Sequence, residues 1–238
     1  MIVAILISVH LLADFLFQTS AYSEKKRKKL KPLLLHCFIY FIVFEILLLP
    51  ILQFKKAFLL GMIISVLHFL INFIKNKLEK SFPQRRLQIW IFSINQLIHF
   101  ALLIGMNYIF NLENSVSNLY INLQGYENFK TIILYISVFS IIFEPASVFI
   151  RKLFTSISPK TYPKANLEEL KAGNIIGKLE RIIIAILLLN NQFGVIGFVL
   201  TAKSIARFKQ MENRDYLIGT LTSFLIVLIS VFILKGLL

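Results

Sequence analysis

The stretch SVHLLADFLFQTSAYSEKKRKK (residues 8–29) joins the end of an apolar run to a cluster of basic residues. Within the run, His10, Asp14 and Gln18 follow one another at intervals of four residues, which places them on one face of a helix. Hydrocarbon penalises ionisable side chains by roughly 3 kcal/mol each on insertion scales. The stretch therefore predicts a membrane helix whose polar face meets partners on other helices.

The composition is that of an all-α membrane protein. Of the 238 residues, 57% are hydrophobic and 23 are Phe, and the mean hydropathy is +0.75. Such a chain has too little polar surface for a soluble globule. Helices are favoured because in hydrocarbon each backbone group must bond within its own segment. We expect a polytopic transmembrane helical bundle of six or seven membrane segments, drawn at 1–18, 33–54, 57–74, 87–110, 130–150, 182–202 and 216–235.

The net charge of +14 is unevenly distributed along the chain. Of the 26 Lys and Arg residues, 22 lie in the segments 19–32, 75–86, 151–181 and 203–215. The positive-inside rule places these segments in the cytoplasm and the N-terminus outside, with the first helix retained because no basic region precedes it. Anionic lipid headgroups are the expected partners. No surface of interleaved basic and aromatic residues indicates nucleic acid.

One apolar stretch conflicts with a simple count of crossings. It separates 151–181 from 203–215, both of which are basic, so a single crossing would put one of them outside. Its middle, LLLNNQFGVIGF (187–198), contains three amides and two glycines. These residues favour a broken or re-entrant hairpin, which would leave six true crossings and an external C-terminus. The alternative is an ordinary seventh span whose amides bond to neighbouring helices.

We expect one integral membrane domain over residues 1–238. It would have a four-helix half with the His and Asp residues (1–110) and a set of C-terminal helices with basic cytoplasmic elements (130–238). In the longest cytoplasmic loop, NLEELKAG (166–173) predicts a short helix at the membrane surface that ends at Gly173.

The four histidines lie one in each of the first four spans, and most have a polar residue three or four positions away. Counting from the basic ends at about 1.5 Å per residue places all these groups in the cytoplasmic half of the membrane. We therefore expect the four helices to bring them to a common depth. The set comprises His10 with Asp14, His36, His68 with Asn72, and His99 with Asn95 and Gln96.

Imidazole and carboxylate are good ligands for zinc and similar divalent metals, and a site with three protein ligands and a water can generate hydroxide near neutral pH. Asp14 and His10 are the candidate acid–base residues, and Asn72 and Gln96 would orient the imidazoles or bind substrate. The alternative is that each group makes a hydrogen bond between helices, worth about 1 kcal/mol or less. The candidate metal ligands are His10, Asp14, His36, His68 and His99.

Two acidic residues lie in spans away from the first helix. Glu45 is in the outer half of the second span, and we expect it to be far from the histidines. Glu144 precedes Pro145, which removes a backbone donor and is expected to bend the fifth span.

A second group of charged residues lies in the C-terminal half. If the stretch between them is a hairpin, Glu180 and Arg181 would stand beside Lys203 and Arg207. Such a group predicts a site for a phosphate or a phospholipid headgroup at the inner surface. The alternative is ordinary basic anchoring with a surface ion pair.

Several of these elements together resemble one bacterial integral-membrane family, known as domain of unknown function 3307. The resemblance extends over nearly the whole chain and implies a multi-pass protein of the bacterial cytoplasmic membrane. It implies no reaction. The family usually has Asp where this chain has Asn72, and often has Asp where it has Asn95. The segments that carry the resemblance are HLLADFLFQ, LLLH, LHFLINFIK, NQLIH, IGKLERIII and IGFVLTAKSIARF.

Three functions are compatible with these patterns. The first is a metal-dependent membrane hydrolase acting on a lipid-linked or phosphate-bearing substrate, a class whose intramembrane His and Asp pattern is loosely similar. The second is a small transporter or ion pathway, working as a homo-oligomer, which the broken segment favours. The third is a non-catalytic subunit whose basic face recruits a partner protein.

Overall fold

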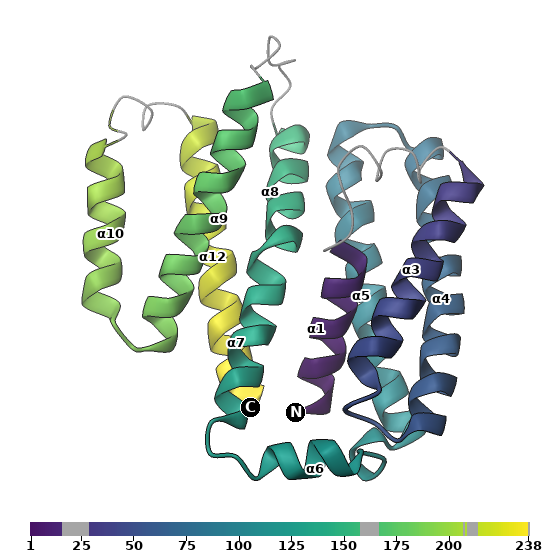
Figure 1. The fold of residues 1–238 in the computed structure, drawn as a ribbon. Helices are drawn as coiled ribbons and strands as arrows, with labels where there is room; N and C mark the ends of the chain where they lie inside the picture. The colour runs from purple at the N-terminus through teal and green to yellow at the C-terminus, as the bar shows by residue number, and fades with distance from the viewer. Residues whose placement is uncertain (16–28, 158–166, 207, 209–213, 238) are drawn as a thin grey trace. The chain divides into compact units, whose positions relative to one another are not determined.

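The computed structural model describes residues 1–15, 29–157, 167–206, 208 and 214–237 (Figure 1). Across these residues every regular element is a helix, and the β pairing consists of an isolated bridge between Leu52 and Val116. Five helical segments here are long and apolar enough to cross a membrane, and two shorter apolar helices accompany them. The expected all-α helical bundle is therefore confirmed. Contacts divide the chain into two compact units, Met1–Ser137 and Val138–Leu238.

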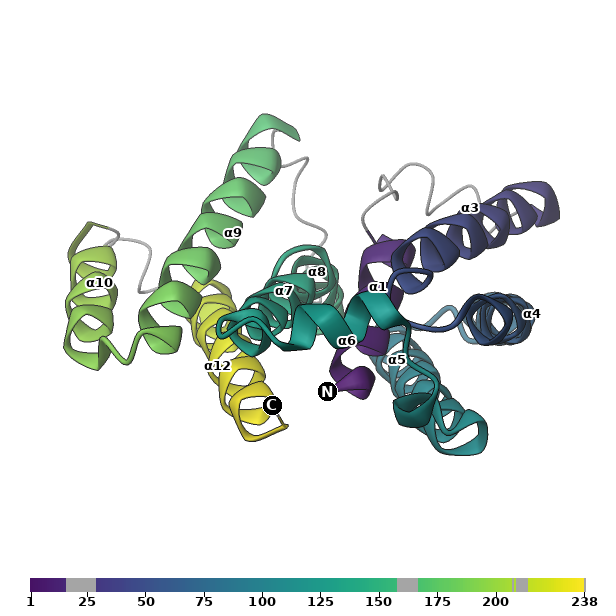
Figure 2. The same ribbon diagram turned by 60° about the horizontal axis from the view of Figure 1, so that its bottom comes forward.

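Four long helices form most of the first unit: α1 (Ile2–Phe15), α3 (Leu30–Leu48), α4 (Phe54–Ser81) and α5 (Arg85–Phe110). Helix α3 packs against α1 and α4, and α5 packs against α4 and α1. In Figure 2, α3, α4 and α5 stand in sequence order around α1. The apolar core between them includes Leu6, Tyr40, Phe44, Leu60 and Leu103, each at most 1% exposed.

One end of this unit is closed by short elements after α5. The 3₁₀ helix η1 (Leu112–Asn114) and helix α6 (Asn118–Gln124) follow it, before α7 (Phe129–Ile142). The Gln53 amide donates to the carbonyl of Ser115, and the Ser117 amide donates to that of Ile51. These bonds fix the α3–α4 turn to the segment after α5, so they hold three helix ends together.

The second unit contains α8 (Glu144–Ile157), α9 (Leu167–Leu189), α10 (Phe193–Ala206) and α12 (Arg214–Leu237). Helix α12 packs against α8 and α9, and α10 packs against α9. The fifth predicted span is interrupted at Phe143, between α7 and α8, where Pro145 removes a backbone donor as the sequence indicated.

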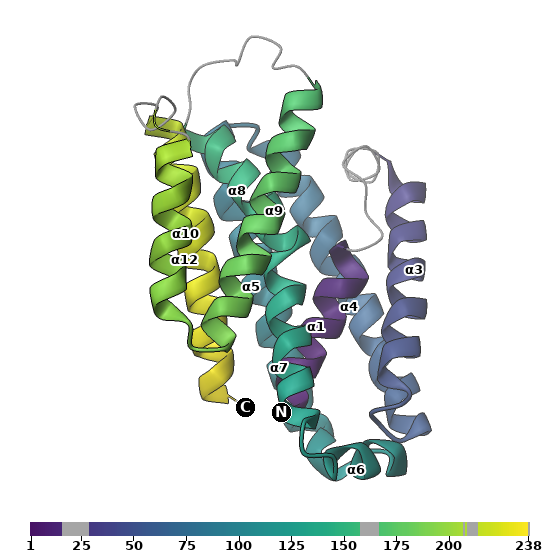
Figure 3. The same ribbon diagram turned by 60° about the vertical axis from the view of Figure 1, so that its left-hand side comes forward.

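The stretch 182–202 is a helical hairpin. Helices α9 and α10 lie side by side and are joined by a short turn at Asn190–Gln192 (Figures 1 and 3). Asn191 adopts a φ of 58°, and Lys235 of α12 donates to its Oδ1 at 2.9 Å. The predicted break is confirmed, and the alternative of one uninterrupted span is wrong. The first residue of α9, Leu167, and the last residue of α10, Ala206, therefore lie at the same end of the hairpin.

Several helix boundaries differ from the sequence prediction, including the end predicted at Gly173 and the end of α4. Helix α9 continues through Gly173 and Gly177 to Leu189, so the expected stop at Gly173 is wrong. A glycine inside a helix costs only about 0.5–1 kcal/mol, and the apolar residues that follow continue the helix at greater gain. Helix α4 runs seven residues past the predicted end of its span, and this extension contains Lys75, Lys77 and Lys80.

Gly219 of α12 lies against α8, where a Cβ would come within 2.3 Å of Cζ of Phe154. We expect Gly219→Ala to destabilise the protein by about 1–3 kcal/mol, because overpacking outweighs the gain in helix propensity. Gly236→Ala in the same helix meets nothing within 4 Å and should be neutral. Thermal unfolding in detergent measures both. Equal melting temperatures for the two variants would contradict this packing, whereas Phe154→Leu should restore stability to the Gly219→Ala protein.

Candidate metal centre

The four histidines lie together inside the first unit, one on each of its long helices. His10, His36, His68 and His99 are each at most 3% exposed. The ring centroids of His68 and His99 are 4.8 Å apart, those of His36 and His68 are 5.4 Å apart, and those of His10 and His68 are 5.7 Å apart. The structure thus brings to one place the imidazoles that the sequence placed at one depth.

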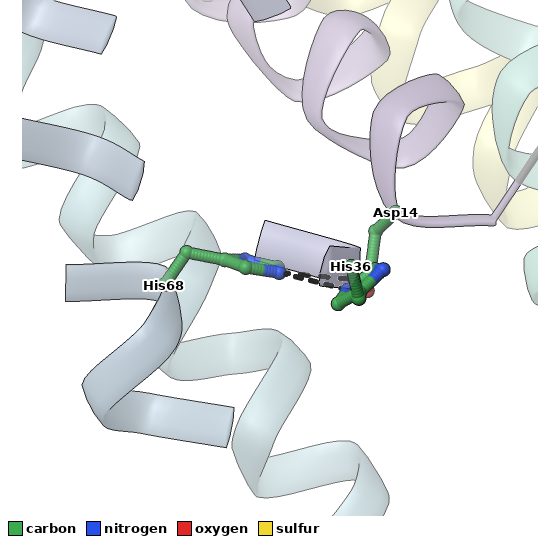
Figure 4. A group of neighbouring side chains, drawn as sticks. All are labelled: Asp14, His36 and His68. Atoms are coloured by element: carbon green, nitrogen blue, oxygen red, sulfur yellow. Dashed lines mark hydrogen bonds and ion pairs between the residues drawn. The ribbon is translucent and has the colours of Figure 1, made fainter. Parts of the chain in front are cut away.

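Three of the predicted ligands form the centre of this cluster (Figure 4). Asp14 Oδ1 lies 3.0 Å from His36 Nε2 and 3.7 Å from His68 Nε2. The two Nε2 atoms are 3.3 Å apart. These three atoms come from α1, α3 and α4, and among the described residues they form the group of His, Cys, Asp and Glu side chains that could hold a metal ion.

His10 and His99 form a stacked pair beside this centre. Their rings are 4.9 Å apart at an angle of 22°, and His10 Nδ1 lies 3.0 Å from the hydroxyl of Tyr40. His99 Nδ1 lies 2.7 Å from the backbone carbonyl of Asn95. Because a carbonyl can only accept, that nitrogen of His99 is the protonated one and Nε2 has the lone pair. The sequence analysis placed both residues among the ligands, but the structure groups three of the five.

Tyr40 is a member of the cluster that the sequence analysis missed. Its ring stacks on His68 at 3.9 Å with an angle of 9°, and its hydroxyl meets His10. It is 0% exposed. The available signal was its spacing, since Tyr40 follows His36 by four residues and so shares its face of α3. Tyr40 links the stacked pair to the three-residue centre.

The predicted amides have separate positions. Asn72 Nδ2 lies 3.0 Å from His68 Nε2 and donates to the His68 carbonyl at 3.0 Å. This amide therefore holds His68 in place. The side chain of Gln96 neighbours His10. Gln18, the third polar residue of the opening stretch, lies outside the described residues.

Glu45 is buried in α3 at the boundary with α4. A Cβ at Gly61 would overlap its carboxyl group, so the glycine provides the space for that side chain. Glu45 is absent from the group of candidate ligands. Glu45 is therefore a suitable control residue, since it is a buried acid outside the group of candidate ligands.

The charged residues of the C-terminal half lie in the second unit. Lys203 Nζ pairs with Glu180 Oε2 at 2.6 Å, which joins α10 to α9. Glu144, at the start of α8, pairs with Lys178 of α9. Arg207 lies outside the described residues. The structure thus brings Glu180 and Lys203 together as expected for a hairpin.

Arg181 is buried and its guanidinium is engaged by the protein itself. Nε donates to the Ile142 carbonyl at 2.6 Å, and Nη2 donates to the Phe143 carbonyl at 3.3 Å and to Ser147 Oγ at 2.6 Å. Nη1 reaches Ser223 Oγ of α12 at 3.3 Å. Arg181 therefore satisfies carbonyls at the break between α7 and α8 rather than facing a headgroup in this structure.

The fold and this cluster define an all-α protein with several apolar helices and a buried His/Asp group that could hold a metal. The chain belongs to the family described as "Protein of unknown function (DUF3307)", which matches residues 2–125. The matched region contains α1, α3, α4 and α5 and thus every residue of the cluster. No curated protein and no solved structure matches the chain.

Substituting Arg181 tests its structural role. We expect Arg181→Met to lower the free energy of unfolding by about 2 kcal/mol or more, because buried carbonyls lose their donor. Lys203→Met breaks a partly exposed pair and should cost about 1 kcal/mol or less. Titrating each variant from mild detergent into SDS measures the unfolding of the second unit. A stable Arg181→Met protein with weakened binding to anionic vesicles would favour the headgroup site instead.

Proposed function

We propose that this chain is an integral membrane protein that binds one divalent transition-metal ion, zinc above all, between α1, α3 and α4. Asp14, His36 and His68 are the ligands. The observation that supports this most strongly is the mutual spacing of their three donor atoms. Zinc prefers nitrogen and carboxylate donors of this kind in tetrahedral arrangement.

The spacing fits a tetrahedron. For an ion 2.0–2.1 Å from each ligand, the ligand atoms of a tetrahedral site lie about 3.3 Å from one another. The three separations are 3.0, 3.3 and 3.7 Å. Without a metal, a proton on His36 Nε2 can bond to Asp14 Oδ1, and the Asn72 amide can donate to His68 Nε2. A metal ion would instead bind both Nε2 lone pairs and neutralise the buried carboxylate at the same time.

The surrounding residues support the same assignment. Tyr40 stacks on His68, and Asn72 donates to the His68 carbonyl, so this ligand is held from two sides. Such positioning by neighbours is typical of metal ligands. The three ligands are buried, each at most 5% exposed, so they need partners inside the bundle, and a shared cation is one such partner.

We further propose that the reaction is hydrolysis of a lipid-linked or phosphate-bearing substrate. Three protein ligands leave a fourth position, and a water bound there has its pKa lowered to about 7. His10, beside His68 and bonded to Tyr40, would accept a proton from that water as its oxygen bonds to phosphorus, and would return a proton to the leaving-group oxygen as the P–O bond to that group breaks. The exposed basic residues at the nearby helix ends favour an anionic substrate, and they are Lys29, Lys31, Lys77, Lys80, Arg85 and Arg86.

The same basic helix ends support a location in the bacterial cytoplasmic membrane with the N-terminus outside. In that orientation the N-terminus of α3, the C-terminus of α4 and the N-terminus of α5 face the cytoplasm, as the positive-inside rule requires. The cluster then lies beneath the cytoplasmic headgroups. If no hydrolysis is observed, the following experiments would favour one of two other functions. These are metal transport by a homo-oligomer and recruitment of a partner protein.

Metal analysis tests the first step of the proposal. Purified wild type, supplied with zinc and dialysed, should retain about one ion per chain. Asp14→Asn and His68→Asn should each weaken binding by about 100-fold or more, because loss of an outer-shell partner alone costs 10–100-fold. Glu45→Gln removes a buried acid outside the cluster and should leave zinc content unchanged. Elemental analysis of each protein gives the result, and full zinc content in Asp14→Asn would contradict the ligand assignment.

Turnover tests the second step. With zinc bound, the protein should release inorganic phosphate from farnesyl diphosphate or dioctanoyl phosphatidic acid in detergent micelles. His10→Asn should lower kcat by about 100-fold or more while zinc stays bound, because it removes the proton acceptor and spares the ligands. A phosphate assay with parallel metal analysis separates the two effects. Zinc bound without any phosphate release would rule out this substrate class and favour transport.

A further inference from the structure

One face of α4 changes character along its length. Apart from the adjacent pair Leu60 and Gly61, its buried residues recur every three or four positions, as expected for a single seam facing the bundle. The first half of the seam is apolar, from Ala57 to Ile64, whereas the second half is polar. We call the second half the polar seam, and its four members are His68, Asn72, Asn76 and Glu79, exposed by 0, 2, 9 and 7%.

The polar seam extends well beyond the metal centre. From His68 to Glu79 the helix rises about 16 Å, and Glu79 lies two residues before the end of α4 at Ser81. His68 is a proposed ligand and Asn72 holds it, but Asn76 and Glu79 are further along and serve neither purpose. Buried amides and carboxylates are costly in a membrane protein, so such a line of them is a functional indication.

The neighbouring helices contribute apolar side chains at this end. Leu33 of α3 and Ile89 and Phe92 of α5 are buried there, and α3 and α5 are the helices that pack most extensively against α4. Beyond the metal centre the buried polar side chains include Asn95 of α5, 4% exposed, together with the line on α4. That line begins at the closed metal centre and ends at the rim of exposed Lys and Arg side chains.

We infer that the polar seam is the route by which a divalent cation and its water reach Asp14, His36 and His68. This inference rests on the proposed metal site. Asn72 and Asn76 offer amide oxygens about 6 Å apart along the helix, which can replace hydration in steps. Glu79 is the carboxylate at the outer end. It provides a favourable first contact for a cation among basic side chains that would otherwise repel it.

The rate of zinc loading tests the route. Metal-free full-length protein is mixed with zinc in a stopped-flow instrument, and a fluorescent zinc indicator reports uptake. Glu79→Gln should slow uptake by about tenfold with the same final zinc content, because electrostatic attraction affects the association rate. Asn76→Leu should slow it similarly. Glu113→Gln, an exposed acid in η1 at the other end of the unit, is the matched control and should load at the wild-type rate.

If Glu79→Gln fails to fold, the reactivity of introduced cysteines provides a second test of the route. The chain has one cysteine, Cys37, so Cys37→Ser gives a background without thiols. In that background Asn76→Cys should react with a small charged methanethiosulfonate reagent, whereas Ile64→Cys in the apolar half should not. If the reagent modified Asn76→Cys no faster than Ile64→Cys, the route would be overturned.

The outcomes separate this inference from the proposed function. Zinc bound by the wild type, with unchanged loading rates in Glu79→Gln and Asn76→Leu, overturns the route and leaves the metal site standing. No zinc bound by the wild type defeats the metal site and the cation route together. Slow loading at full final content, with a reactive thiol at position 76, supports both.

Discussion

The high cost of placing polar side chains inside an apolar bundle is the constraint on which this structure depends. Asp14, His36 and His68 cannot each be accommodated alone, and they meet at separations of 3.0–3.7 Å. Tyr40 and Asn72 then fix His68 by stacking and hydrogen bonding. The geometry of the four long helices in the first unit is thus tied to the partners that these few residues require, and the family match covers these four helices.

The second unit meets the same constraint by different means. There the groups that need partners belong to the backbone, because the helix breaks between α7 and α8 and the carbonyls of Ile142 and Phe143 at this break accept hydrogen bonds from a side chain. Arg181 donates to both, and its remaining donors reach two serines. An arginine that looks like a headgroup ligand in the sequence is therefore part of the internal structure. Its partners come from residues about 40 positions away, so local spacing cannot identify them.

Sequence patterns predicted the helical class, the break at Asn190–Gln192 and the residues of the cluster, because each has a local physical signature. Amides and glycines interrupt an apolar run, and residues four apart share a helix face. The patterns could not select the three residues that could hold a metal from the five candidates, since that choice depends on how α1, α3 and α4 are rotated against one another. Tyr40 was missed because an aromatic residue in an apolar span is ordinarily core. The end of α9 was missed because a weak local glycine penalty is overridden by the apolar residues beyond it.

The hairpin formed by α9 and α10 adds no net passage through a lipid layer, because the chain leaves it at the end where it entered. Helix α12 therefore keeps the same polarity however deeply the hairpin is inserted. A change in the length of its arms would leave the compartment of every later residue unaltered. In a membrane the hairpin would in this sense be topologically silent.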